Sequence, residues 1–197
     1  NVFLVGGLGV DSIKKTKLLS RNELENSLDL KFKKKNILIT FHPVTLENST
    51  SGIQMKELLK ALSKLRDTTL IFTMPNADVD GKIIFSMIED FAKEHSDAYA
   101  FTSLGQQKYF SCIAQVDCVI GNSSSGLLEV PTFKKGTINI GDRQRGRLKA
   151  TSIIDCEPNL KSISKALKEI YKPKFRAKVN STINPYGDGV AVEKIIK

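Results

Sequence analysis

The feature that most constrains the fold is a regular alternation of short apolar runs with longer segments of helical periodicity. In the segment around Met55 to Leu65, for example, apolar residues recur at the three- and four-residue spacing of a helix. The short runs are uniformly apolar, as expected for strands that are covered on both faces. The sequence therefore predicts a doubly wound α/β domain with a parallel sheet and helices on both faces. We expect its central strands at residues 37–41, 70–73, 98–101, 118–120 and 137–140.

The remaining elements are predicted from the same patterns. A capping box formed by Ser20 and Glu23 opens a helix, because serine and glutamate at this spacing satisfy each other's backbone N–H groups. Short strands are expected at residues 2–5 and 152–154, and further helices at residues 81–93, 106–114, 126–130, 160–171 and 190–197.

The net charge of +9 raises the question of nucleic acid. However, Lys31, Lys33, Lys34 and Lys35 directly precede a predicted strand, and no aromatic residues interleave with the lysines as a base-stacking surface requires. We therefore expect no nucleic-acid partner and a solvated, lysine-rich surface, which is compatible with attraction of a small anionic substrate.

The chain of 197 residues is 41% hydrophobic, enough for one sizeable core. It contains no apolar stretch of membrane-spanning length, so we expect no membrane partner. Cys112, Cys118 and Cys156 form no CxxC pair and are expected to be buried free thiols, as in the reducing cytoplasm. The N-terminal Asn1 and the absence of a signal-peptide pattern make us expect part of a longer protein.

Ligands of doubly wound folds bind beyond the carboxyl ends of the strands. One such loop is "GNSSSGLLEVP", where Ser123, Ser124 and Ser125 lie between a strand and a helix. A phosphate would be suited by the backbone N–H groups at the helix start, by the serine hydroxyls and by the small side chains. A serine that only caps the helix, with no ligand bound, explains the same sequence. Glu129 lies about one turn further on, as a ribose-binding carboxylate or as a solvated glutamate.

Two other loops of this edge carry candidate groups. His42 follows a core strand, either to donate to a phosphate and act as an acid or to hold a neighbouring loop. Arg143, Arg145 and Arg147 follow another strand, either as an anion-binding group or as a solvated basic loop. The loops lack a carboxylate cluster, and Asp142 alone is a poor magnesium site, so we expect no metal or other cofactor.

Four motifs in order along the chain carry a resemblance to a known family: "FHPVTLEN", "GNSSSGLLEVP", "NIGDRQRGR" and "NPYGDG". Together they resemble the hydrolysing UDP-N-acetylglucosamine 2-epimerases, bacterial enzymes of sialic and legionaminic acid synthesis. Three serines at 123–125, His42-Pro43 and the arginine loop favour the hydrolysing branch over the non-hydrolysing one. The resemblance implies the Rossmann-like C-terminal half of a GT-B-like two-domain enzyme, with residues 1–189 as the nucleotide-binding domain. The helix of residues 190–197 would pack toward the missing N-terminal domain, and the full-length protein would be a homo-oligomer.

The resemblance also implies roles in binding a UDP-sugar. Ser123 and Ser124 would hold the diphosphate, Glu129 the ribose hydroxyls, and Tyr109 would lie against the uracil. Leu104 backbone groups would read the edge of the uracil. His42, the candidate catalytic residue of this half, would lie at the diphosphate, and one arginine of the 143–147 loop, with Arg147 as the choice, would face the cleft.

The family chemistry is anti elimination of UDP to a glycal, followed by water addition that releases free 2-epimerised sugar. Its acid–base carboxylates would come from the missing half, so this half by itself would bind UDP without turnover. The substrate, UDP-N-acetylglucosamine or a 2,4-diacetamido relative, stays open. A GT-B glycosyltransferase shares the fold and the ribose-binding glutamate, and a non-catalytic nucleotide-binding module is a third interpretation.

Overall fold

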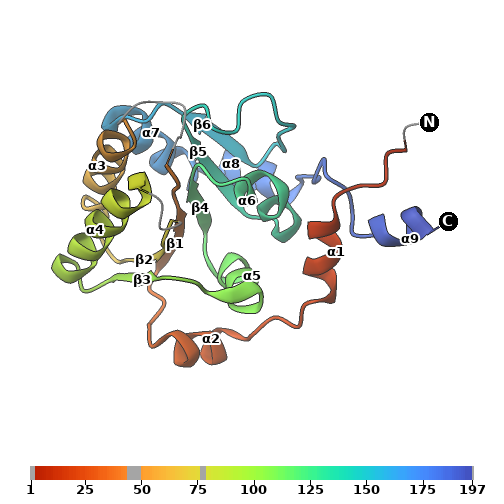
Figure 1. Ribbon diagram of the computed structural model, residues 1–197, viewed down its shortest axis with the longest axis horizontal. Helices are drawn as coiled ribbons and strands as arrows, with labels where there is room; N and C mark the ends of the chain where they lie inside the picture. Colours follow the sequence, from red (N-terminus) through yellow and green to blue (C-terminus); the bar gives the residue numbers. More distant parts are fainter. Residues whose placement is uncertain (1–2, 44–49, 76–78, 197) are drawn as a thin grey trace.

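The computed structural model describes residues 3–43, 50–75 and 79–196, and within them it shows one six-stranded sheet covered by helices (Figure 1). The strand order is β3-β2-β1-β4-β5-β6, and every neighbouring pair is parallel. The order reverses between β1 and β4, so the crevice for a ligand lies at their carboxyl ends. The predicted doubly wound fold and its five central strands are confirmed. The strands are β1 (Lys35–Thr40), β2 (Thr68–Thr73), β3 (Ala98–Phe101), β4 (Cys118–Gly121), β5 (Gly136–Ile140) and β6 (Ile153–Cys156).

Both faces of the sheet are buried. Ile37 and Ile39 of β1 belong to the core beneath one set of helices, whereas Leu38 between them belongs to the core of the opposite face. Successive side chains of a strand point to opposite faces, so a strand covered on both sides is apolar throughout. The first face carries α3 (Ser51–Leu62), α4 (Val79–Glu94), α7 (Leu160–Glu169) and α8 (Pro173–Asn180), and the second carries α2 (Arg21–Leu28) and α5 (Gly105–Gln115).

The prediction of a strand at residues 2–5 is wrong for the part that the structure describes, because residues 3–7 have no strand partner. Phe3 and Leu4 are 77% and 95% exposed. An apolar, β-branched run becomes a strand only where a neighbouring strand pairs with it. Sequence analysis also missed α1 (Leu8–Lys15) and α8, whose start at Pro173 follows the preference for proline at the first helical position.

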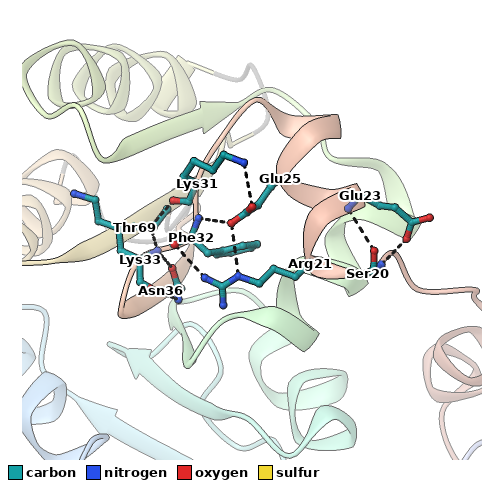
Figure 2. Close-up of polar contacts among 9 residues, drawn as sticks. All are labelled: Ser20, Arg21, Glu23, Glu25, Lys31, Phe32, Lys33, Asn36 and Thr69. Atoms are coloured by element: carbon teal, nitrogen blue, oxygen red, sulfur yellow. Dashed lines mark hydrogen bonds and ion pairs between the residues drawn. The ribbon is translucent and has the colours of Figure 1, made fainter.

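The capping box that opens α2 is present as predicted, with Ser20 and Glu23 exchanging both hydrogen bonds (Figure 2). Further along α2, Glu25 accepts from the Phe32 backbone N–H at 2.9 Å and from Lys31 Nζ at 3.3 Å (Figure 2). The Phe32 N–H, followed by Lys31, holds the pKa of the Glu25 carboxyl below its ordinary value. Lys31 therefore contacts Glu25 while its side chain stays 78% exposed, in agreement with the predicted solvated lysine surface.

The first and last helices, α1 and α9 (Ala191–Ile196), contact each other at one margin of the molecule (Figure 1). The carboxylate of Asp11 in α1 is buried and accepts from the backbone N–H groups of Ala191 and Val192, both at 3.1 Å. A buried cap of this kind satisfies N–H groups that a helix start leaves without partners. The last helix is therefore anchored to the first, although its Ile196 side chain is 79% exposed.

The cysteine prediction is confirmed for the thiols. All three are free, with Cys112 and Cys118 buried and Cys156 partly buried. Burial raises the pKa of Cys112 to about 12, so this thiol stays protonated at neutral pH. Across the described residues, no helix combines the length and the apolar character needed to cross a membrane.

Candidate functional site

A cavity of about 400 Å³ lies at the carboxyl ends of the central strands, where the strand order reverses. Among the predicted site residues, His42, Leu104, Tyr109, Ser123 and Glu129 line it. Ser124 and Arg147 do not. Ser125, which sequence analysis named with the other two serines as a hydroxyl suited to a phosphate, also lines the cavity. The remaining lining residues, which sequence analysis did not single out for a role, are mostly small or hydroxylated: Thr40, Thr73, Met74, Thr102, Ser103, Gly105, Gln106 and Phe110. Because parallel strands end at one edge, loops far apart in sequence meet there.

Close approach of β1 and β4 depends on Gly121, the last residue of β4. A Cβ atom built on Gly121 would lie 1.9 Å from the Thr40 carbonyl oxygen, and its φ of +145° lies in a region that favours glycine. No other residue type fits there without moving β1. The glycine therefore lets the turn after β4 run directly alongside the end of β1.

Asn122 fixes the backbone of His42. Its Oδ1 accepts from the His42 N–H and its Nδ2 donates to the His42 carbonyl oxygen, both at 2.8 Å. The Asn122 side chain is fully buried, whereas His42 is partly buried, so both bonds are shielded from water on the Asn122 side. Sequence analysis missed this residue, although a polar residue that directly follows a buried strand is a usable signal.

The serine turn consists of Ser123, Ser124 and the start of α6 (Ser125–Leu128). The backbone N–H groups of Ser123 and Ser124 have no acceptor in the described part of the chain. By contrast, the Ser125 N–H donates to Ser123 Oγ at 3.4 Å. The turn therefore has two adjacent unused N–H donors, one on the cavity-lining Ser123 and one on the next residue, a suitable arrangement for an anion.

The predicted helix of residues 126–130 is shorter than expected and changes type. α6 has four residues and is followed by the 3-10 helix η1 (Val130–Phe133), with Glu129 at the junction. Pro131 contributes to this break, because proline has no backbone N–H to continue the α-helical pattern. Glu129 thus ends a single turn of helix instead of lying inside a long one, and a macrodipole argument carries little weight here.

A chain of hydroxyl groups orients Glu129. The Tyr109 hydroxyl donates to Ser125 Oγ at 2.6 Å, and the Ser125 hydroxyl donates to Glu129 Oε2 at 2.6 Å. Burial, and to a lesser extent the Glu129 charge, raises the pKa of Tyr109, so the phenol remains a donor. A Cβ built on Gly9 of α1 would lie 3.7 Å from Glu129 Oε1, which places the first helix beside the other carboxylate oxygen. The sequence did not indicate that Ser125 orients Glu129, because Tyr109, which donates to Ser125, lies on a different helix.

Leu104 precedes α5 with its side chain buried. Its backbone N–H has no acceptor in the described part of the chain, whereas the next N–H, of Gly105, donates to Ser103 Oγ at 3.2 Å. The Leu104 N–H is therefore available to a ligand at the rim of the cavity.

In the arginine loop, it is Arg143 that approaches the serine turn. Arg143 Nη1 and Gln144 Nε2 donate to the Asn122 carbonyl oxygen at 3.2 and 2.8 Å. Gln144 is buried, and its Oε1 has no partner within the described residues. Arg143 and the predicted choice, Arg147, are both exposed and neither lines the cavity, so the hydrogen bond to the Asn122 carbonyl oxygen is what distinguishes Arg143. The proposed contact of Arg147 with a ligand is untested, but the geometry favours Arg143.

The "NPYGDG" motif has a structural role. Asn184 Nδ2 donates to the Leu128 carbonyl oxygen at 2.8 Å and to Thr132 Oγ1 at 2.7 Å. The Tyr186 carbonyl oxygen accepts from the Gly7 N–H at 2.7 Å. This motif therefore ties the segment before α1 to the helices that carry Glu129.

The described residues hold no group of three or more His, Cys, Asp and Glu side chains that is arranged for a metal ion.

The model of the family UDP-N-acetylglucosamine 2-epimerase matches residues 1–197. A Campylobacter jejuni GDP/UDP-N,N'-diacetylbacillosamine 2-epimerase (hydrolyzing) is 40% identical over 197 residues, which is 100% of this chain and 51% of that protein. A Legionella pneumophila UDP-N,N'-diacetylbacillosamine 2-epimerase (hydrolyzing) is 30% identical over 194 residues, 98% of this chain and 50% of that protein. The chain thus spans about half the length of the curated relatives it matches.

Among solved structures, S. aureus MnaA with UDP resembles the fold with a TM-score of 0.74 and 18% identity, over 98% of this chain and 51% of that one.

Proposed function

Because the chain belongs to the UDP-N-acetylglucosamine 2-epimerase family, we propose that it is the UDP-binding, C-terminal half of a hydrolysing 2-epimerase. Its substrate would be a UDP-linked N-acetyl amino sugar, in a bacterial route to sialic or legionaminic acid. The observation that carries this proposal is the pair of unused N–H groups at Ser123 and Ser124, one helical turn from the oriented carboxylate of Glu129. A diphosphate and a ribose require these two kinds of group at neighbouring positions.

The serine turn would hold the diphosphate by backbone N–H groups and by the Ser123 hydroxyl, without a metal. His42 faces the same cavity on a backbone that Asn122 fixes, and it would contact the diphosphate as the bond to the sugar breaks. Charge that develops on the leaving UDP is stabilised best by donors that are already in place. We include Arg143 as the cationic group behind this turn, in preference to Arg147.

Glu129 would accept from the two ribose hydroxyls. Its Oε2 already accepts from Ser125, and the fixed direction of that bond leaves the remaining lone pairs of the carboxylate for the ligand. Tyr109 and the Leu104 N–H lie in the same cavity and would contact the uracil. The S. aureus protein of similar fold was solved with UDP, which is consistent with this arrangement.

The chemistry divides between two halves. A base removes the proton from sugar C2 while UDP leaves C1, and the electron pair of the C–H bond forms the double bond of a glycal. Water then adds across that double bond, with a hydroxyl at C1 and a proton at C2, to give free 2-epimerised sugar. The present half would stabilise UDP as leaving group, and the acid–base carboxylates would come from the N-terminal half.

The experiment uses the full-length protein with UDP-N-acetylglucosamine and with a UDP-2,4-diacetamido sugar, in the absence of any acceptor. We expect UDP and free 2-epimerised sugar in equal amounts, with deuterium from heavy water at C2. The preferred sugar identifies the substrate, and the names of the two relatives favour the diacetamido sugar. UDP release only after an acceptor alcohol is added, with the sugar transferred to that alcohol, would contradict the proposal and indicate a glycosyltransferase.

The C-terminal half taken alone should bind UDP without turnover, because its acid–base partners are absent. Packing of α9 toward the other half, and a homo-oligomeric full-length enzyme in the cytoplasm, stay predictions.

A further inference from the structure

A second pocket, of about 280 Å³, lies at the amino ends of β4 and β5. This is the edge of the sheet opposite to the crevice described above. Asp117 directly precedes β4, Gly136 begins β5, and Tyr171 follows α7. The pocket takes no part in the proposed binding of UDP, so its chemistry needs a separate explanation.

Positive charge gathers at this pocket. Lys134 and Lys135 line it from the segment before β5, and Arg176 lines it from α8. Lys35, the last residue of the lysine run, places its Nζ 4.8 Å from the centroid of the Tyr171 ring. None of these four cations forms an ion pair within the described part of the chain.

One carboxylate, Asp117, opposes this charge. Its Oδ2 accepts from the Asn36 backbone N–H at 2.8 Å, a bond that holds it to the start of β1. Against the three cationic lining residues, a single carboxylate leaves the pocket with a surplus of positive charge. The surplus attracts anions, and low-dielectric walls strengthen that attraction.

Two groups in the pocket, the Tyr171 hydroxyl and the Lys135 ammonium group, would be stabilised by a nearby anion. The hydroxyl of Tyr171 is buried and forms no hydrogen bond of standard distance and angle among the described residues. Burial, and to a lesser extent the nearby charge of Asp117, raises the pKa of this hydroxyl, so it remains a donor. Lys135 is partly buried, and this burial lowers the pKa of its ammonium group while the charge of Asp117 opposes the effect. A buried donor without a standard hydrogen bond and a buried cation without an ion pair both cost free energy. An anion placed between them would offset both costs.

We propose that this amino-end pocket binds a small phosphorylated ligand, whose phosphate contacts Lys135 and Arg176 and accepts from the Tyr171 hydroxyl. A phosphate carries up to two negative charges and three strong acceptor oxygens, which match two cations and one neutral donor. The arginine fork suits two of those oxygens. The pocket volume of about 280 Å³ lies just below the range typical for small-molecule sites, roughly 300–1,000 Å³, so a small metabolite fits better than a nucleotide sugar.

The test is a titration of the ¹⁵N-labelled 197-residue chain with inorganic phosphate, followed by amide chemical shifts at constant ionic strength. We expect saturable shifts at Gly136 and Asn180, which line the pocket. Shifts at Ser123 and Ser124 would report phosphate in the other site, so one experiment separates the two edges. A UDP titration, read at those serines, tests the proposed function independently.

Variants decide whether the pocket binds through the named groups. Arg176→Gln removes an exposed guanidinium, and we expect the dissociation constant for phosphate at Gly136 to rise about tenfold, as for a lost charge-assisted bond. Tyr171→Phe, which keeps the ring, should raise it about threefold or more. Arg66→Gln, at an arginine before β2 on the same edge, is the matched control and should leave it unchanged. Absence of saturable shifts at Gly136 and Asn180, or equal affinity in Arg176→Gln and Arg66→Gln, would overturn the proposal.

Discussion

Asn122 offers the sharpest test of how the crevice is held together. Asn122→Ala removes both hydrogen bonds to the His42 backbone, each 2.8 Å long in the structure. A buried polar group that loses its partner costs about 1–3 kcal/mol, so two groups give roughly 2–6 kcal/mol. The His42 side of the contact is only partly buried, so water can replace some of the loss. We therefore expect the free energy of unfolding to fall by about 2–4 kcal/mol.

The expected loss of about 2–4 kcal/mol in Asn122→Ala is a large share of the roughly 5–15 kcal/mol that stabilises a typical domain. Urea denaturation followed by far-ultraviolet circular dichroism measures this loss, and with a slope of about 2–3 kcal/mol per molar the midpoint should fall by about 0.7–2 M. Asn22→Ala is the matched control, because Asn22 lies exposed on α2, away from the crevice. It should change stability by less than about 0.5 kcal/mol. Equal effects of the two substitutions would refute the role given to Asn122.

Two further predictions concern the ligand and the metal. Glu129→Gln should weaken UDP about 10- to 100-fold in calorimetric titration, since a charge-assisted hydrogen bond is worth about 1.5–3 kcal/mol and about 1.4 kcal/mol is tenfold. Pyrophosphate, which has no ribose, should be affected much less, and equal weakening of both ligands would remove the ribose role. Full-length activity should survive EDTA, because the crevice presents hydrogen-bond donors instead of a carboxylate cluster; an absolute requirement for Mg²⁺ would contradict this.

The strands of the sheet could be predicted because both of their faces are buried, which leaves an unmistakable apolar run. Val119, for example, lies between Cys118 and Ile120, and all three are buried although they face different helices. The wrong strand at residues 2–5 and the missed helix α1 arise where the local sequence pattern does not reveal which residues are paired or buried. Residues 2–5 have strand-like composition, but pairing is a property of neighbours, and none is present for the described residues 3–5. In α1 only Val10, Asp11 and Ile13 are buried, and the glycines at 6, 7 and 9 disguise its start.

The residues of the candidate site likewise fall into those that the sequence could predict and those that it could not. Residues that would touch a ligand, such as Ser123 and Glu129, follow strands at a known edge, so topology alone places them near one another. Residues that act on other protein groups, such as Asn122 and Gln144, depend on which backbone atom they meet, and no local pattern specifies that partner. Arg143 illustrates the difference: three arginines in one loop look equivalent in sequence, and only the position of the Asn122 carbonyl distinguishes them.

For Glu129, the structure changes the physical basis of the proposed ribose contact. The sequence places a carboxylate a turn after three serines, which favours an explanation based on the start of a helix. In the structure that helix is one turn long, and Ser125, itself the acceptor for Tyr109, donates to the carboxylate. These two hydroxyl-bearing partners restrict both the position and the available lone pairs of the acid, which a helix terminus does not do. Because Ser125 begins α6 and Tyr109 lies on α5, the geometry of a proposed ribose contact depends on the packing of two helices against the end of β4. The three consecutive serines thus differ in their contacts: the first two keep unused backbone N–H groups, which we propose bind the diphosphate, and the third donates to the Glu129 carboxylate.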